Sequence, residues 1–233
     1  MVMFDEPLHV KLVKKNVMVG GKAPEQVESD LKAGISRIGG FWRHPSYFEA
    51  YLYSASLLIE QGKAIGVLDE IGLPGFYLQR HALELLLKGL LGWMVDIADI
   101  RKQLCISDVE PSGRLIRDLR TSHDLQRLHN RIIEFGTALD LPLPPVELGN
   151  LIKDMKRIEI TDTWSRYCSS PGKTDESVEG IEHIPKEVVI PIVEFQERLD
   201  AITALVASRE AFGDSYEDRL HEISAGLSAA LDH

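Results

Sequence analysis

The feature that most limits the fold of this chain is a leucine-rich stretch near its centre. From Leu83 to Val95 almost every position is apolar, and only Glu84, Lys88 and two glycines interrupt the run. A helix that is apolar on nearly every side must be covered by other elements. The stretch is too short and too polar to cross a membrane, which takes about 20 apolar residues. It therefore predicts a buried central helix over about 76–104.

Amphipathic segments on both sides supply the partners that such a helix needs. Apolar residues recur in them at spacings of three and four, and glycine or proline separates them. The expected helices cover the residues from 44–46 to about 61, the residues from Thr121 or Ser122 onward, 146–158, the residues from Pro191 onward, and 216–231. Residues 62–75 are expected to form a loop, with Gly62 ending the helix before it. The sequence thus predicts an all-α protein with an antiparallel bundle of four to five helices.

The two ends of the chain are predicted to lie outside this bundle, which we assign to residues 44–210. Residues 1–43 are expected to form an N-terminal arm, with a short strand pair before Gly20 and a helix whose Leu31 and Ile35 lie on its apolar face. Residues 211–233 are expected to form a C-terminal amphipathic helix that packs on its own bundle or on a second chain.

Composition narrows the classes of function. The net charge of −10 argues against a general nucleic-acid coat, which needs a broadly basic surface. Two cysteines without a CxxC motif, and no signal-peptide pattern, predict a cytoplasmic protein in which Cys105 and Cys168 are at least half-buried. Residues 171–174 end like a phosphate-binding loop but lack its first glycine. No cofactor motif or metal-ligand spacing is present, so we expect neither.

Two short motifs in the central region resemble a known family. Residues 80–88 read R-H-A-L-E-x-x-L-K, and residues 122–128 read S-H-D-L-x-x-L. Together they look like bacterial HEPN (higher eukaryotes and prokaryotes nucleotide-binding) proteins, and the resemblance covers about residues 45–210. It implies a bundle of four or five helices, often a homodimer, common in toxin–antitoxin and phage-defence systems. It also implies a module that binds RNA, a nucleotide or a protein partner.

The first motif carries three charged residues on one side of a helix. Arg80, Glu84 and Lys88 are spaced by four, so the carboxylate can pair with both cations. Two interpretations stay open. The trio either holds neighbouring helices in register as a polar contact, or it lines a cleft for a ligand such as phosphate.

The second motif ends an R-x5-H element, Arg117 to His123. The resemblance implies a catalytic role, because active HEPN proteins pair two such elements across a dimer and cut RNA without metal. Histidine can move protons at neutral pH, while arginine can hold a phosphate. About one such spacing is expected by chance in a chain of this composition. A catalytic role for the element is favoured by its predicted place at a helix N-terminus, where backbone N–H groups favour anions. The alternative is that His123 merely begins that helix.

Five arginines make this the one basic stretch of the chain. They are offset only by Asp118 and Asp124, and they are Arg114, Arg117, Arg120, Arg127 and Arg131. Such residues either contact phosphates or pair with acidic neighbours on a solvated face. We therefore expect a binding module for RNA, a nucleotide or a protein, and as the alternative a metal-independent, dimeric endoribonuclease.

Overall fold

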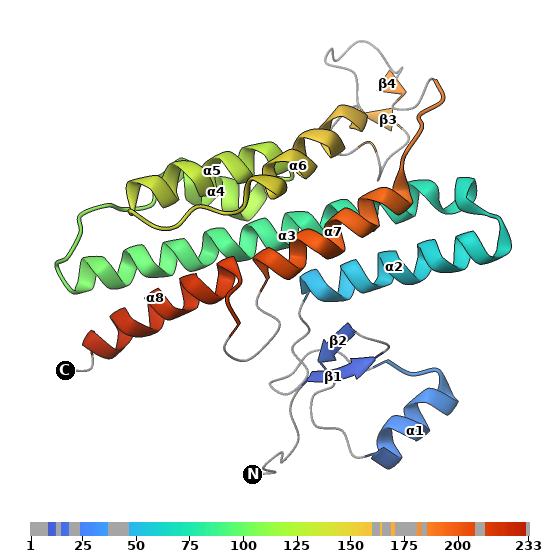
Figure 1. Cartoon of the computed structure of the whole chain (residues 1–233), viewed down its shortest axis with the longest axis horizontal. Helices are drawn as coiled ribbons and strands as arrows, with labels where there is room; N and C mark the ends of the chain where they lie inside the picture. Colours follow the sequence, from blue (N-terminus) through green and yellow to red (C-terminus); the bar gives the residue numbers. More distant parts are fainter. Residues whose placement is uncertain are drawn as a thin grey trace.

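Helices are the main elements of the part of the protein that the computed structural model describes (Figure 1). The structure describes residues 9–12, 15–18, 24–36, 47–159, 164, 169–170, 181–182, 186–207 and 213–231. Its helices are α1 (Pro24–Ala33), α2 (Tyr47–Ile65), α3 (Leu68–Gln103), α4 (Gly113–Thr121), α5 (Leu125–Ala138), α6 (Val146–Ile158), α7 (Ile192–Val206) and α8 (Tyr216–Leu231). Two short hairpins, β1 (His9–Leu12) with β2 (Lys15–Met18) and β3 (Ser169–Ser170) with β4 (Ile181–Glu182), are the only sheets in these ranges. The all-α prediction is confirmed.

Helix α3 is the axis of the fold, as its apolar sequence predicts. It contacts α2, α4, α5, α7 and α8, and Figure 1 shows it running through the middle of the molecule. Leu83, Leu87, Leu90 and Leu91 are completely buried along it. Despite its length of 36 residues, neither α3 nor any other helix in the described ranges is long and apolar enough to span a membrane.

The predicted loop over 62–75 is wrong, because most of it is helical. Helix α2 ends at Ile65, followed by Gly66 with a φ of +75°, and α3 begins only two residues later. Gly62 lies inside α2 at its contact with α3, where an added Cβ would be 2.7 Å from Cγ1 of Ile71. Glycine is common just after the end of a helix, but Gly62 instead allows α2 and α3 to approach closely.

Helix α4 is the element that the sequence did not predict. The expected third helix began at Thr121 or Ser122, but the structure has two helices in this region. Ser112 caps α4 by accepting a hydrogen bond from the amide of Leu115, and Asp124 caps α5. Helix α4 has nine residues and buries only Leu115 and Asp118, so its apolar stripe is too short to be recognised in the sequence.

The predicted elements at the two ends of the chain are present, but the predicted packing of α1 is wrong. Strands β1 and β2 pair antiparallel, with His9 opposite Met18, and α1 follows them. The expected apolar face of α1 is wrong, since Leu31 is 76% exposed and Ile35 is 50% exposed, while Asp30 is buried. Helix α8 packs on α3 and α7, and its Leu220 belongs to the main core. The C-terminal helix thus packs on its own bundle.

Cys105 is exposed, contrary to its prediction. It follows α3 with a φ of +56°, and its amide donates to the carbonyl of Lys102 while the next amide donates to the carbonyl of Arg101. This hydrogen-bond pattern closes the helix end and leaves residue 105 outside it. Cys168, residues 171–174 and the expected helix start at 44–46 lie outside the described residues.

Candidate functional site

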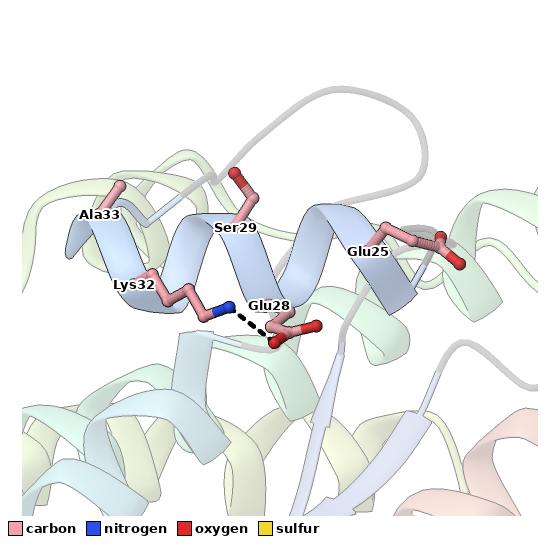
Figure 2. Close-up of a pocket in the computed structure, with 5 residues that line it drawn as sticks. All are labelled: Glu25, Glu28, Ser29, Lys32 and Ala33. Atoms are coloured by element: carbon pink, nitrogen blue, oxygen red, sulfur yellow. Dashed lines mark ion pairs between the residues drawn. The ribbon is translucent and has the colours of Figure 1, made fainter.

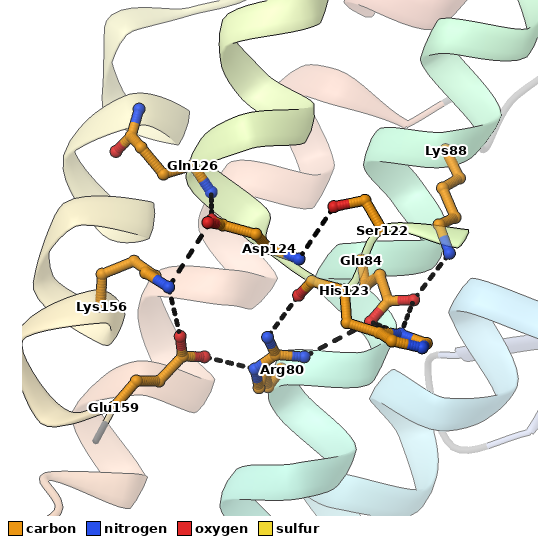
Figure 3. Close-up of polar contacts among 9 residues, drawn as sticks. All are labelled: Arg80, Glu84, Lys88, Ser122, His123, Asp124, Gln126, Lys156 and Glu159. Carbon is orange, nitrogen blue, oxygen red and sulfur yellow. Dashed lines mark hydrogen bonds and ion pairs between the residues drawn. The ribbon is translucent and has the colours of Figure 1, made fainter. Parts of the chain in front are cut away.

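Arg80 is a buried cation that joins three parts of the bundle. It is 2% exposed, and its guanidinium donates through Nη1 to Oε2 of Glu84 at 3.3 Å. Its Nε donates to the carboxylate of Glu159, just after α6, and its Nη2 donates to the backbone carbonyl of His123, between α4 and α5 (Figure 3). One side chain of α3 therefore fixes both the end of α6 and the turn before α5.

Glu84 is the anion at the centre of this network. Its Oε1 accepts from Nζ of Lys88 at 2.9 Å and lies 3.0 Å from Nδ1 of His123. Burial raises the pKa of this carboxyl group, but the hydrogen bonds and charges of Lys88 and His123 outweigh it, so the pKa is lower than usual. Glu84 is thus held ionised with the imidazole and the ammonium beside it.

A second set of charges closes the network on the side of α6. Nζ of Lys156 lies 3.1 Å from Oε2 of Glu159 and 3.6 Å from Oδ1 of Asp124. The contact to Glu159 is an ion pair without the angles of a hydrogen bond. The same Oδ1 of Asp124 accepts from the amides of Gln126 and Arg127, which caps α5.

The whole cluster is charge-balanced, with cations at Arg80, Lys88 and Lys156 and anions at Glu84, Asp124 and Glu159. We call these six residues the buried ion network. Arg80 and Glu84 lie below the surface, which agrees with a polar contact between helices and leaves no room for a ligand on Arg80. Glu159 and Lys156 were not found from sequence, because Glu159 lies 79 residues from its partner Arg80 and outside any motif.

His123 is more exposed to solvent than Lys88, Asp124 and Lys156 around it. Its side chain is 42% exposed, and its Nδ1 faces the carboxylate of Glu84 at 3.0 and 3.2 Å. Within the described residues no hydrogen bond is formed by its other ring nitrogen, Nε2. A carboxylate on Nδ1 orients an imidazole, which leaves Nε2 to exchange a proton with a ligand.

Three of the five predicted arginines form an exposed face on α4. Arg114, Arg117 and Arg120 are all exposed, and no ion pair or hydrogen bond of their side chains occurs among the residues described. Their spacing of three residues confines them to an arc of about 120° around the helix axis. The middle of this arc lies about 130° around the helix from the side that buries Leu115 and Asp118. We call these three residues the arginine face.

The other two arginines pair with the protein itself. Nε of Arg131 donates to Oδ2 of Asp118 at 2.9 Å, and its Nη1 donates to Glu134 at 2.7 Å. Arg127 lies farther away, with Nη1 at 3.9 Å from Oδ1 of Asp118. The interpretation that arginines of this stretch pair with acidic neighbours therefore describes Arg127 and Arg131, because both lie within ion-pair distance of the buried Asp118.

No family model, no curated protein and no solved structure matches the chain. The resemblance to HEPN proteins accordingly stays a prediction, carried by the two motifs at 80–88 and 122–128.

The R-x5-H element differs in geometry from its prediction. Arg117 lies in the middle of α4, and His123 precedes the cap of α5, so the element spans two helices. The expected anion position at the helix N-terminus is occupied by the chain's own Asp124. Among the described residues no contact joins the side chains of Arg117 and His123. Arg120 is closer in the chain, three residues before His123, which limits the backbone separation to roughly 10 Å.

An open pocket lies along α1, lined by Glu25, Glu28, Ser29, Lys32 and Ala33, with Lys32 and Glu28 paired at 2.8 Å (Figure 2). All five residues belong to one helix, and none is a predicted site residue. No group of three histidine, cysteine or carboxylate side chains in the described ranges is arranged to hold a metal ion.

Proposed function

We propose that this chain is a HEPN-like helical module that binds RNA through the arginine face. The observation that supports the proposal is the exposure of Arg114, Arg117 and Arg120 on one arc of α4, without ion-pair partners among the described residues. In a chain of net charge −10, such a concentration of unpaired cations favours a polyanion.

The chemistry of arginine favours RNA phosphates over other anions. A guanidinium offers two parallel donors to one phosphate, and successive arginines on a rigid helix can engage successive phosphates. Contacts of this kind position a nucleic acid without reading its sequence. RNA therefore ranks before a mononucleotide, which has too few phosphates for three arginines, and before a protein partner.

The proposal is tested by reversing charge on the arginine face. We expect the variant Arg114→Glu/Arg117→Glu/Arg120→Glu to lose single-stranded RNA binding by more than about 100-fold in a fluorescence anisotropy titration. The matched control reverses three exposed cations on other elements, Lys63→Glu/Lys186→Glu/Arg219→Glu, which changes the net charge equally. Equal weakening by both variants would show that the overall charge, and not the face, controls binding.

A second function, RNA cleavage, is favoured by the pairing of His123 with Glu84. In a metal-independent cleavage the 2′-hydroxyl attacks the adjacent phosphorus, the bond to the 5′-oxygen breaks, and a 2′,3′-cyclic phosphate and a 5′-hydroxyl result. His123 is suited to carry the proton from the attacking oxygen to the leaving oxygen through Nε2. Glu84 holds its Nδ1, and the arginine face holds the phosphate backbone.

Cleavage is tested separately from binding. We expect wild-type protein to give products with cyclic phosphate ends and His123→Ala to give none while still binding RNA. If the wild-type protein binds RNA but does not cleave it, RNA binding remains as the function and RNA cleavage is excluded. The HEPN resemblance also implies a dimer in the catalytic form, so light scattering should give about twice the mass of one chain if the second function holds. That resemblance is likewise the sole support for a bacterial defence or toxin–antitoxin setting.

A further inference from the structure

Three rings form a cluster where α2 meets α3. The imidazole of His81 is stacked on Tyr77, with ring centroids 5.6 Å apart and planes 7° from parallel. Tyr51 of α2 meets the same imidazole edge-on, with centroids 4.5 Å apart and an angle of 88°. All three side chains are half-buried, so each is held by packing and still reaches the surface. We call these three residues the aromatic step.

The aromatic step lies on the same side of α3 as Glu84, the carboxylate that faces His123. Tyr77, His81, Glu84 and Lys88 fall within an arc of about 60° on α3, given 100° per residue. His81 is three residues from Glu84, so the two side chains are neighbours on one face of α3, with roughly 5–6 Å between their Cβ atoms. Glu84 in turn contacts His123 at 3.0 Å. His81 is therefore about one helical turn from Glu84, the carboxylate that holds the imidazole of His123.

We propose that the aromatic step stacks an unpaired base of single-stranded RNA whose phosphates lie on the arginine face. This inference rests on the proposed RNA binding and names the form of RNA that the site takes. Aromatic side chains beside cationic grooves bind single strands in this way, because every base has a flat face that can stack. In a duplex the bases are already stacked on each other and are not accessible to a half-buried ring on a helix surface.

Rings used only for core packing would have been expected deeper in the molecule. Phe76, the neighbour of Tyr77 in sequence, is completely buried and packs on Trp164 and Phe195. Tyr77 and His81 are instead half-buried, and they stack on each other along the polar side of α3. Such a preformed stack presents a rigid aromatic face with little conformational entropy to lose on binding.

The first test needs no protein variant. Wild-type protein is titrated with a fluorescent 12-nucleotide single-stranded RNA, with the same RNA carrying abasic sites, and with its duplex. We expect the intact single strand to bind about 10-fold more tightly than the abasic strand and than the duplex. Equal affinity for the intact and abasic strands, or tighter binding of the duplex, overturns the proposal.

The second test locates the stacking contact. Tyr77→Leu keeps an apolar side chain of similar reach, and Tyr77→Phe keeps the ring. We expect Tyr77→Leu to weaken binding of the intact strand about 10-fold and to leave the abasic strand unchanged, with Tyr77→Phe close to wild type. Wild-type affinity for Tyr77→Leu overturns the assignment, and a misfolded Tyr77→Leu leaves the abasic comparison as the deciding result.

These outcomes separate the two proposals. Binding that depends on the bases but not on Arg114, Arg117 and Arg120 would remove the arginine face and keep the aromatic step. Binding that depends on the arginines but not on the bases would remove the aromatic step and keep the arginine face. A wild-type protein that binds none of the three RNAs contradicts both.

Discussion

Arg80 and the arginines of α4 carry the same side chain, but the protein treats them in opposite ways. Arg80 is 2% exposed and donates to two carboxylates and a backbone carbonyl on three separate elements. Arg114, Arg117 and Arg120 are exposed and have no such partners within the described part of the chain. The first arginine is part of the structure of the bundle, and the other three are available to a ligand.

This difference shows how a motif can mislead when it is interpreted one residue at a time. Arg80 belongs to the more recognisable motif, yet its charge is balanced inside the protein by Glu84 and Glu159. The arginine face lies on a helix that no motif indicated. The two regions meet at His123, whose carbonyl binds Arg80 and whose ring faces Glu84. Their contrast leads to four predictions about stability.

The largest effect is expected for Arg80→Met. It leaves Glu84 and Glu159, with side chains 2% and 1% exposed, without their shared cation. Breaking a buried ion pair by removing one partner costs about 3–5 kcal/mol, so the free energy of unfolding in urea should fall by that amount. The double variant Arg80→Met/Glu159→Gln should recover part of the loss. A loss below about 1 kcal/mol for Arg80→Met would mean that the network contributes little.

A smaller effect is expected for Arg131→Gln. It removes the close partner of Asp118, whose side chain is 7% exposed, and should lower the free energy of unfolding by about 1–3 kcal/mol. The matched control is Arg127→Gln, since that side chain is 57% exposed and lies 3.9 Å from the same carboxylate. The control should lose at most about 0.5 kcal/mol. Equal losses for both variants would contradict the assignment of Arg131 as the main partner of Asp118.

The pH dependence of stability should report on Glu84. Its pKa in the folded protein is lower than its usual value of 4.5, so the unfolded chain takes up the proton first as the pH falls. Its contribution to stability is therefore complete above about pH 4.5 and is lost below it. Urea unfolding between pH 6 and 3.5 should show a steeper decline for wild type than for Glu84→Gln. Glu197→Gln, an exposed control, should decline as wild type does.

The smallest effect on stability is expected on the arginine face. The variant Arg114→Gln/Arg117→Gln/Arg120→Gln changes only exposed residues and should alter the free energy of unfolding by less than about 1 kcal/mol in total. Thermal unfolding followed by circular dichroism measures this directly. A loss above 2 kcal/mol would assign these arginines to the structure, as with Arg80, and would remove the contrast between the two regions.

The sequence predicted those parts of the fold that have long apolar stripes. The bounds of α6, Val146–Ile158, agree with the expected helix, and α5 buries the apolar residues that recur along it at spacings of three and four, Leu125, Leu128, Ile132 and Phe135. Their apolar residues recur every three or four positions and are bounded by proline or a capping aspartate, so local sequence contains the necessary information.

The remaining parts depend on contacts that are distant in sequence. The i, i+4 pairs of Glu84 with Arg80 and Lys88 follow from helical spacing, and they are present. The ion pair of Arg80 with Glu159 does not follow, because it needs α6 to end against α3. The pairing within the basic stretch could not be predicted either, because it depends on the buried Asp118. The burial of Asp118 requires helix α4, which is too short to be recognised in the sequence.

The most direct test of the arginine face is the salt dependence of RNA binding. Each phosphate contact to a single strand contributes about 0.7 to the slope of the logarithm of affinity against the logarithm of salt concentration. If Arg114, Arg117 and Arg120 each bind a phosphate, their replacement by glutamine should make this slope shallower by about 2. Equal slopes for wild type and the triple variant would contradict RNA binding by the arginine face.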